Sequence, residues 1–333
     1  MKKIINCITI GDEKGIGLEL IFKIWNNYKN RTKTFFILGD YKIINENLLK
    51  YQFRFNLKKI DSPEHAEKYF NNFLPIIDLK SKNKKFVSID SIIKSYELAK
   101  NNQISGVITL PINKEKIISI NNKFIDHTNF YETIDNTSSN MIFYSKNIII
   151  SPLTTHIPIN KVSSYINKRF IKNKLILLIK TLENDFKIKK PKIIVSGLNP
   201  HAGESGKIGK EEEEIIIPVI KYLKQKNFNV YGPASADSLF TKKNIDKFDC
   251  ILTMYHDQAL IPFKLLNFNN GVNFTSGLSF IRTSPCHGTA YDLVGTNKAS
   301  ESSLLNAILL ANKIFLNRNY VKKISRTKFS YWS

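Results

Sequence analysis

The chain has few cysteines, and they lie far apart. Only three of its 333 residues are cysteine, namely Cys7, Cys250 and Cys286. Three scattered thiols exclude a disulfide framework and a cysteine-type zinc module. The sequence therefore predicts free thiols in a reducing, cytoplasmic compartment.

Long apolar runs are also missing. No stretch approaches the roughly 18 apolar residues that a membrane-spanning helix needs. The N-terminal MKKIINCITIGDEKG begins like a signal peptide, but its apolar part is short, lacks a small-residue cleavage site and stops at Gly11. We interpret this segment as the first buried strand and expect no membrane partner.

Acidic residues are outnumbered, with 28 Asp and Glu against 50 Lys and Arg, and the formal net charge is +22. Such a charge would suit a nucleic acid, because lysine and arginine release counterions from phosphates. The lysines, however, are spread along the whole chain among many Asn and Ile residues, which is typical of an AT-rich genome. No RNP-type aromatic pattern or helix-turn-helix signature organises them. We therefore expect no nucleic-acid partner, and a basic nucleic-acid-binding protein remains an alternative.

Short apolar runs alternate with longer amphipathic stretches, which predicts an α/β protein with largely parallel sheets. The length suits two domains. Strands are expected at residues 3–10, 34–39, 106–110, 141–145, 147–151, 192–197, 228–232, 250–255 and 271–277. Helices are expected at residues 16–27, 89–101, 166–184, 210–226 and 300–317. Between residues 50 and 87 the pattern is too weak to assign.

Four consecutive acids, Glu211 to Glu214, fall in the first turn of the expected helix 210–226. Carboxylates at that end oppose the positive end of the helix dipole, so we interpret the acid run as structural rather than catalytic. Neither GDEKGIG at 11–17 nor GKIGKE at 206–211 completes a dinucleotide fingerprint or a Walker A motif. Any dinucleotide must therefore bind by another type of loop.

Three of the six histidines follow expected strands directly. They are His156 in SPLTTHIP, His201 in SGLNPHAGESG and His256 in MYHDQ. Ligands bind at strand carboxyl ends in open α/β sheets, so these side chains are expected to share one crevice. Three neutral imidazoles predict a zinc or other transition-metal site. Taken singly, each histidine is better explained as a hydrogen-bonded packing residue, and it is the set of three that favours a metal site.

Nine motifs occur in an order that resembles the PdxA family of 4-hydroxythreonine-4-phosphate dehydrogenases along nearly the whole chain. The motifs are GDEKGIGLEL, LPINKEKI, DHTNF, TTHIPI, SGLNPHAGESGKIGKEE, GPASADSLF, MYHDQALIPFK, GVNFTSGLSFIRTS and HGTAYDLVG. The chain departs from the family pattern at Glu13 and Lys14, at Asp126 and Asn129, and at Cys286. None of these departures removes a residue that matches a family metal ligand or substrate cation.

The resemblance implies two α/β domains with a cleft between them, as in isocitrate and isopropylmalate dehydrogenases. Residues 1–119 with 276–333 would form the cofactor-binding domain, and residues 120–275 would carry the metal ligands and the dimer interface. The protein would be a homodimer with its active site at the subunit interface.

The resemblance also assigns the site residues. A divalent metal (zinc, magnesium or cobalt) would be held by His156, His201 and His256, with one ligand from the partner subunit. The substrate would contact His127, Thr128, Lys264, Asn273 and Arg282, while Asp237 and Lys264 would serve catalysis. NAD or NADP would bind through the segment that contains His287, Gly288, Thr289, Ala290 and Asp292.

The implied reaction oxidises the C3 hydroxyl of 4-phosphooxy-L-threonine and then removes its carboxylate. The product would be 3-amino-2-oxopropyl phosphate, in the biosynthesis of pyridoxal 5'-phosphate (vitamin B6). One alternative is a 4-phospho-threonate dehydrogenase of the same family, because that substrate presents the same carboxylate, hydroxyl and phosphate. An alternative of another class is a phosphotransacetylase-like acyltransferase, which needs no metal held by histidines.

Overall fold

The computed structural model describes residues 3–80, 87–113 and 126–329, and their side chains as far as Tyr320. The chain forms two compact units. The first comprises Met1–Thr137 and Leu278–Leu316, and the second comprises Ser138–Gly277 and Asn317–Ser333. The domain boundary predicted at 119/120 lies outside the described residues, and the predicted division into 1–119 with 276–333 and 120–275 stays a prediction.

The first unit is built on a parallel sheet with the strand order β3-β4-β2-β1-β5-β12. Its strands are β1 (Ile5–Thr9), β2 (Thr34–Gly39), β3 (Asn56–Lys59), β4 (Phe73–Asp78), β5 (Gly106–Thr109) and β12 (Arg282–Pro285). Every residue of β1 is buried, as expected for a central strand that pairs on both sides and is covered on both faces.

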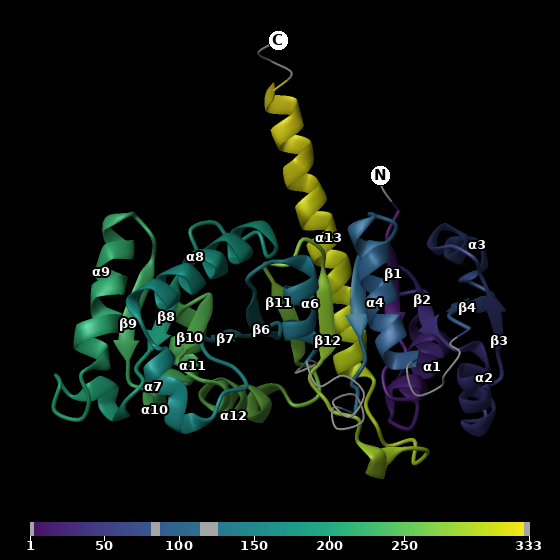
Figure 1. Ribbon diagram of the computed structural model, residues 1–333, viewed down its shortest axis with the longest axis horizontal. Coiled ribbons are helices and arrows are strands. Elements are labelled where there is room, and N and C mark those ends of the chain that lie inside the picture. Colours follow the sequence, from purple (N-terminus) through teal and green to yellow (C-terminus); the bar gives the residue numbers. More distant parts are fainter. Residues whose placement is uncertain (1–2, 81–86, 114–125, 330–333) are drawn as a thin grey trace. The chain divides into compact units, whose positions relative to one another are not determined.

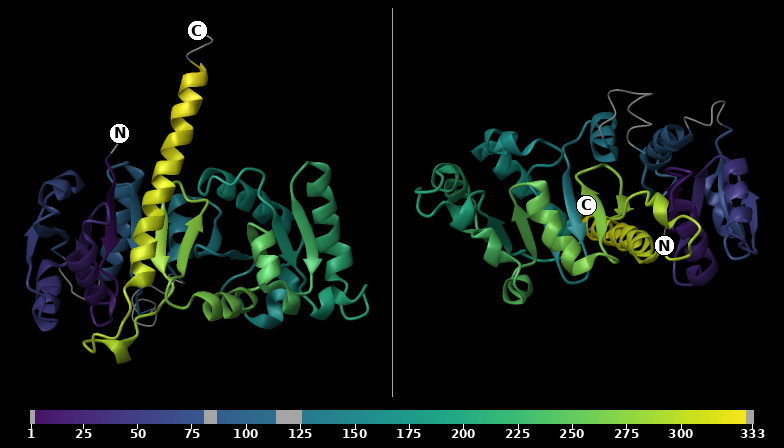
Figure 2. Two further views of the ribbon diagram at one scale, coloured as in Figure 1. Left: turned by 180° about the vertical axis from the view of Figure 1, so that it is seen from behind. Right: turned by 90° about the horizontal axis from the view of Figure 1, so that it is seen from below.

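Helices cover both faces of this sheet, and α1 and α4 lie on opposite sides of it (Figure 2). The helical elements of the first unit are α1 (Gly17–Tyr28), α2 (Tyr41–Lys50), η1 (Pro63–His65), α3 (Ala66–Tyr69), α4 (Val87–Lys100), α6 (His127–Asp135) and η6 (Tyr291–Leu293). The long helix α13 (Ser302–Phe329) begins in this unit. Asp126 caps α6 by accepting a 2.9 Å hydrogen bond from the Asn129 amide. Two residues that depart from the family pattern therefore form the start of this helix.

The second unit has the strand order β11-β6-β7-β10-β8-β9 (Figure 1). Its strands are β6 (Asn140–Tyr144), β7 (Ile149–Pro152), β8 (Ile193–Ser196), β9 (Val230–Ala234), β10 (Cys250–Thr253) and β11 (Val272–Ser276). The strands β7, β10, β8 and β9 are parallel, whereas β6 is antiparallel to both of its neighbours. The helical elements of this unit are η3 (Ile159–Lys161), α7 (Val162–Tyr165), α8 (Lys168–Asn184), η4 (Pro200–Gly203), η5 (Glu212–Ile216), α9 (Ile217–Gln225), α10 (Ala236–Leu239), α11 (Lys242–Lys247) and α12 (His256–Asn267).

The predicted α/β fold is confirmed, and each of the nine expected strands overlaps an observed one. The strands β3, β4 and β12 were not predicted, and β4 lies between residues 50 and 87, where the sequence pattern was too weak to assign. In β3 all four residues are exposed or half-buried, and β12 has the polar sequence RTSP, so neither presents an apolar run. Helix α13 continues to Phe329, beyond the expected end at 317. Within the part of the chain that the structure describes, no helix combines the length and the apolar character that a bilayer span requires.

Candidate active site

The three histidines singled out in the sequence follow three adjacent strands of the second unit. His156 follows β7, His201 follows β8 and His256 is the first residue of α12, directly after β10. The strand β10 pairs in parallel with both β7 and β8. All three histidines therefore lie at the same edge of the sheet, as predicted from the carboxyl ends of parallel strands.

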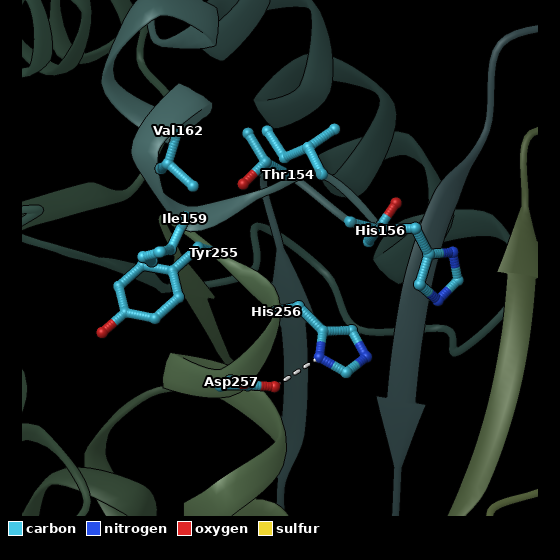
Figure 3. Close-up of a pocket in the computed structure, with 9 residues that line it drawn as sticks. Thr154, His156, Ile159, Val162, Tyr255, His256 and Asp257 are labelled. Atoms are coloured by element: carbon cyan, nitrogen blue, oxygen red, sulfur yellow. Dashed lines mark hydrogen bonds and ion pairs between the residues drawn. The ribbon is translucent and has the colours of Figure 1, made fainter.

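Two of these histidines face each other. The ring centroids of His156 and His256 are 5.5 Å apart, and the rings lie side by side in Figure 3. Nδ1 of His256 is 2.6 Å from Oδ1 of Asp257. A carboxylate in this position fixes the ring orientation of a histidine and leaves the other ring nitrogen available to a ligand. The surrounding pocket is lined by Thr154, Thr155, His156, Ile157, Ile159, Val162, Tyr255, His256 and Asp257.

His201 does not join this pair. It lies close to Asp237 at the start of α10. A hydrogen bond from the Ser235 hydroxyl is the main cause that holds the pKa of the Asp237 carboxyl below its ordinary value, and the nearby His201 contributes in the same direction. Two of the predicted site residues, His201 and Asp237, therefore lie near each other.

The fit of these residues to a metal is partial. Zinc binds histidine nitrogens at about 2.0–2.1 Å and takes three or four protein ligands. The neighbouring imidazoles of His156 and His256 have suitable chemistry for two of them. Nevertheless, across residues 3–80, 87–113 and 126–329 no group of three His, Cys, Asp or Glu side chains is placed to hold an ion. One chain therefore presents two adjacent candidate ligands, His156 and His256, and a third candidate, His201, on a separate loop.

Two of the predicted substrate-binding residues, Lys264 and Asn273, lie in the second unit. Lys264 is exposed in the last turn of α12. Asn273 lies in β11, and its Oδ1 is buried without a hydrogen-bond partner among the described residues. A buried amide oxygen without a donor is costly, so this atom is suited to accept a hydrogen bond from a ligand.

Arg282 is the central cation of the first unit. It is the first residue of β12 and only 4% exposed. Its Nε and Nη2 donate to Oγ1 of Thr109 at 3.0 and 2.7 Å, and its Nη1 donates to Oγ1 of Thr128 at 3.4 Å. Burial lowers the pKa of the guanidinium from its ordinary value. His127 is buried beside Thr128 at the start of α6, so three predicted substrate contacts gather here.

The predicted cofactor segment, which contains His287, Gly288, Thr289, Ala290 and Asp292, packs on the loop before α1. The carbonyl oxygen of Thr289 accepts the Ile16 amide at 3.0 Å. A Cβ on Gly15 would lie 2.9 Å from the same oxygen, so only glycine permits this approach. Nδ1 of His287 is 2.9 Å from the carbonyl oxygen of Gly288, and burial lowers the pKa of this histidine.

Two further contacts of this segment were missed from the sequence. The Tyr291 hydroxyl donates to Oδ2 of Asp12 at 2.5 Å and accepts from Nδ2 of Asn113 at 3.0 Å. The buried pair of Glu19 and Lys23, with 3.1 Å between charged atoms, binds the backbone of residues 295–299. The spacing of four residues within an expected helix was the available signal for this pair.

Solved structures with the same architecture are dehydrogenases. A 4-hydroxythreonine-4-phosphate dehydrogenase from Klebsiella pneumoniae matches with a TM-score of 0.82 and 30% identity, covering 95% of this chain and 98% of that one. The corresponding protein from Burkholderia phymatum matches with a TM-score of 0.78 and 30% identity, covering 94% and 99%. The fold and the strand-end site therefore define the chain as an α/β dehydrogenase.

The family follows from the sequence comparisons. The family model for "Pyridoxal phosphate biosynthetic protein PdxA" matches residues 31–311. The 4-hydroxythreonine-4-phosphate dehydrogenase of Aquifex aeolicus is 40% identical over 311 residues, which are 91% of this chain and 96% of the relative. That of Zymomonas mobilis is 35% identical, covering 93% and 96%. The chain belongs to the PdxA family and is an oxidoreductase, which confirms both predictions.

Proposed function

We propose that the chain oxidises 4-phosphooxy-L-threonine at C3 with NAD or NADP and that decarboxylation then yields 3-amino-2-oxopropyl phosphate, in pyridoxal 5'-phosphate biosynthesis. The observation that carries this proposal is the buried Arg282, which is held by two threonine hydroxyls at a strand end. A planar guanidinium with adjacent hydroxyl donors is suited to a phosphate or carboxylate. The family of the chain supports the choice of substrate.

In this proposal the protein binds and orients the two anionic ends of the substrate. Arg282, His127 and Thr128 hold one anionic group, while Lys264 and Asn273 serve the other. Asp237 completes the proposed catalytic set with Lys264. Segment 287–292 would hold the adenosine half of NAD or NADP, and the bound cofactor would supply the acceptor for the hydride from C3.

We further propose that His156, His201 and His256 hold a divalent zinc, magnesium or cobalt ion, with one ligand contributed by a partner subunit. The proximity of His156 and His256 supports this assignment. When bound, such an ion stabilises negative charge on the oxygen at C3. Removal of the His256 side chain would test its role as a ligand by loss of bound metal in the purified protein.

A homodimer is part of the proposal. Helix α12 exposes a stripe of apolar side chains at positions i, i+4 and i+7, namely Ile261 (68% exposed), Leu265 (85%) and Phe268 (75%) just beyond its end. Large apolar side chains aligned in this way favour burial against a second protein surface. Sedimentation of the wild type and of Leu265→Glu should give a dimer and a dissociated species, respectively.

The deciding experiment is an assay of purified protein with 4-phosphooxy-L-threonine, NAD or NADP and a divalent metal, followed by absorbance of the reduced cofactor. Turnover of 4-phospho-threonate in preference would support the alternative dehydrogenase instead. Acyl transfer to phosphate without reduced cofactor would support the phosphotransacetylase-like alternative. Tight nucleic-acid binding near 0.15 M salt, in a protein that reduces no cofactor, would favour the nucleic-acid alternative.

A further inference from the structure

The loop that carries His201 has an unusual backbone. All six residues from His201 to Gly206 have a positive φ, between 46° and 80°. Four of them, His201, Ala202, Glu204 and Ser205, carry a Cβ and are disfavoured in this left-handed conformation. Surrounding contacts must therefore hold the segment in place, and such strain tends to occur at functional sites.

Glu212 anchors the two residues that lead into this segment. Its side chain is almost completely buried, with 1% exposed. Its Oε1 accepts the backbone amides of Leu198 and Asn199 at 2.7 and 2.8 Å, and its Oε2 accepts Nδ2 of Asn199 at 2.9 Å. A Cβ on Gly203 would lie 2.7 Å from the same Oε2, so the carboxylate also abuts the middle of the left-handed segment.

The chain that leaves the loop, at Gly209, also packs against Asn199. A Cβ on Gly209 would lie 2.1 Å from Nδ2 of Asn199, so the chain passes directly over this amide. Nδ2 of Asn199 also donates to Glu211 at 2.8 Å, and Glu211 accepts the Ser163 hydroxyl at 2.7 Å. The start and the end of the loop are therefore both anchored on Asn199, whose own backbone and side chain are held by Glu212.

We infer that Glu212 is a positioning residue, which holds residues 201–206 in the left-handed conformation and thereby presents His201 to the active site. This inference rests on the proposed function only in taking His201 as an active-site residue. The inference assigns this role to Glu212 and not to Glu214, because Glu212 is buried whereas Glu214 is exposed. Glu214→Ala is therefore a matched control with the same loss of charge in the same segment.

Hydrogen exchange and steady-state kinetics test the inference together. In Glu212→Ala the amides of Leu198 and Asn199 lose their acceptor, so segment 198–206 should exchange faster than in the wild type and in Glu214→Ala. The kcat should fall on the order of tenfold to a hundredfold, because small misplacements of a catalytic side chain have effects of this size. The KM for the nicotinamide cofactor should stay unchanged, because segment 287–292 belongs to the other unit.

Glu212→Gln should recover part of the lost kcat. Its amide oxygen still accepts the two backbone amides, whereas its amide nitrogen cannot accept from Asn199. If Glu212→Ala fails to fold, hydrogen exchange and steady-state kinetics are measured on Glu212→Gln instead and compared with Glu214→Ala.

Three results would overturn the inference: unchanged exchange in segment 198–206, equal losses in Glu214→Ala, or a rise of the cofactor KM that matches the fall in kcat. An inactive wild type would instead refute the proposed function. The exchange measurement would still decide whether Glu212 anchors the loop.

Discussion

Replacement of Arg282 should weaken substrate binding and leave the stability of the fold unchanged or higher. The guanidinium is 4% exposed, and three of its N–H groups donate to the hydroxyls of Thr109 and Thr128. Loss of a charged hydrogen-bond donor from a desolvated site costs about 2–5 kcal/mol in binding. Since 1.4 kcal/mol corresponds to a factor of ten, Arg282→Met should lower kcat/KM at least about thirtyfold.

The same substitution should not weaken the fold. A buried charge pays a desolvation cost in the folded state, and this burial lowers the pKa of Arg282. Methionine has a similar length and removes this desolvation cost, which offsets the loss of the hydrogen bonds to Thr109 and Thr128. We therefore expect the unfolding temperature of Arg282→Met, measured without substrate, to equal or exceed that of the wild type.

Steady-state kinetics and thermal unfolding of three variants complete the test. Arg282→Lys should recover only part of kcat/KM, because a point charge does not reproduce a two-point fork. Arg54→Met makes the same chemical change at an exposed position and should alter neither quantity. Near-normal kcat/KM in Arg282→Met, or a loss of bound metal in that variant, would refute the assigned role.

Three further predictions concern the metal, acid stability and the cofactor segment. Chelation should abolish activity, and zinc, cobalt, manganese or magnesium should restore it; full activity of metal-free protein would contradict the metal proposal. Burial on its own raises the pKa of Asp135, but hydrogen bonds from Ser279 and Lys100 outweigh it and leave the pKa below its ordinary value of 3.8. The ionised carboxylate therefore stabilises the fold above pH 3.8, and this contribution is lost as the pH falls through the folded pKa. Asp135→Asn should accordingly flatten the acid limb of the unfolding free energy measured against pH, and an unchanged slope would refute this cause. Tyr291→Phe removes the hydrogen bond to Asp12 and should raise the KM for the cofactor by roughly two- to tenfold, with the KM for the substrate unchanged.

Local sequence patterns were sufficient for the α/β class and for most strands. A buried parallel strand needs only a short apolar run, and the runs at β1, β2 and β8 read as strands without any knowledge of their neighbours. The same rule failed for the exposed β3 and for β12, where buried polar residues replace the apolar run. The nine motifs and their order were sufficient to predict the family, and the match to the family model confirms this prediction.

The tertiary structure alone decided which chemical groups become neighbours. His156 and His256 are separated by most of the second unit in sequence, and they meet because β7 pairs with β10. No local pattern distinguishes Glu212 from Glu214, yet only Glu212 of the two is buried and accepts the amides of Leu198 and Asn199, just before the His201 loop. Strand pairing and side-chain burial depend on contacts between distant segments, whereas periodicity and capping depend on the nearest residues. For this reason the sequence by itself determined the fold class, most of the strands and the family, and the fold determined the geometry of the site.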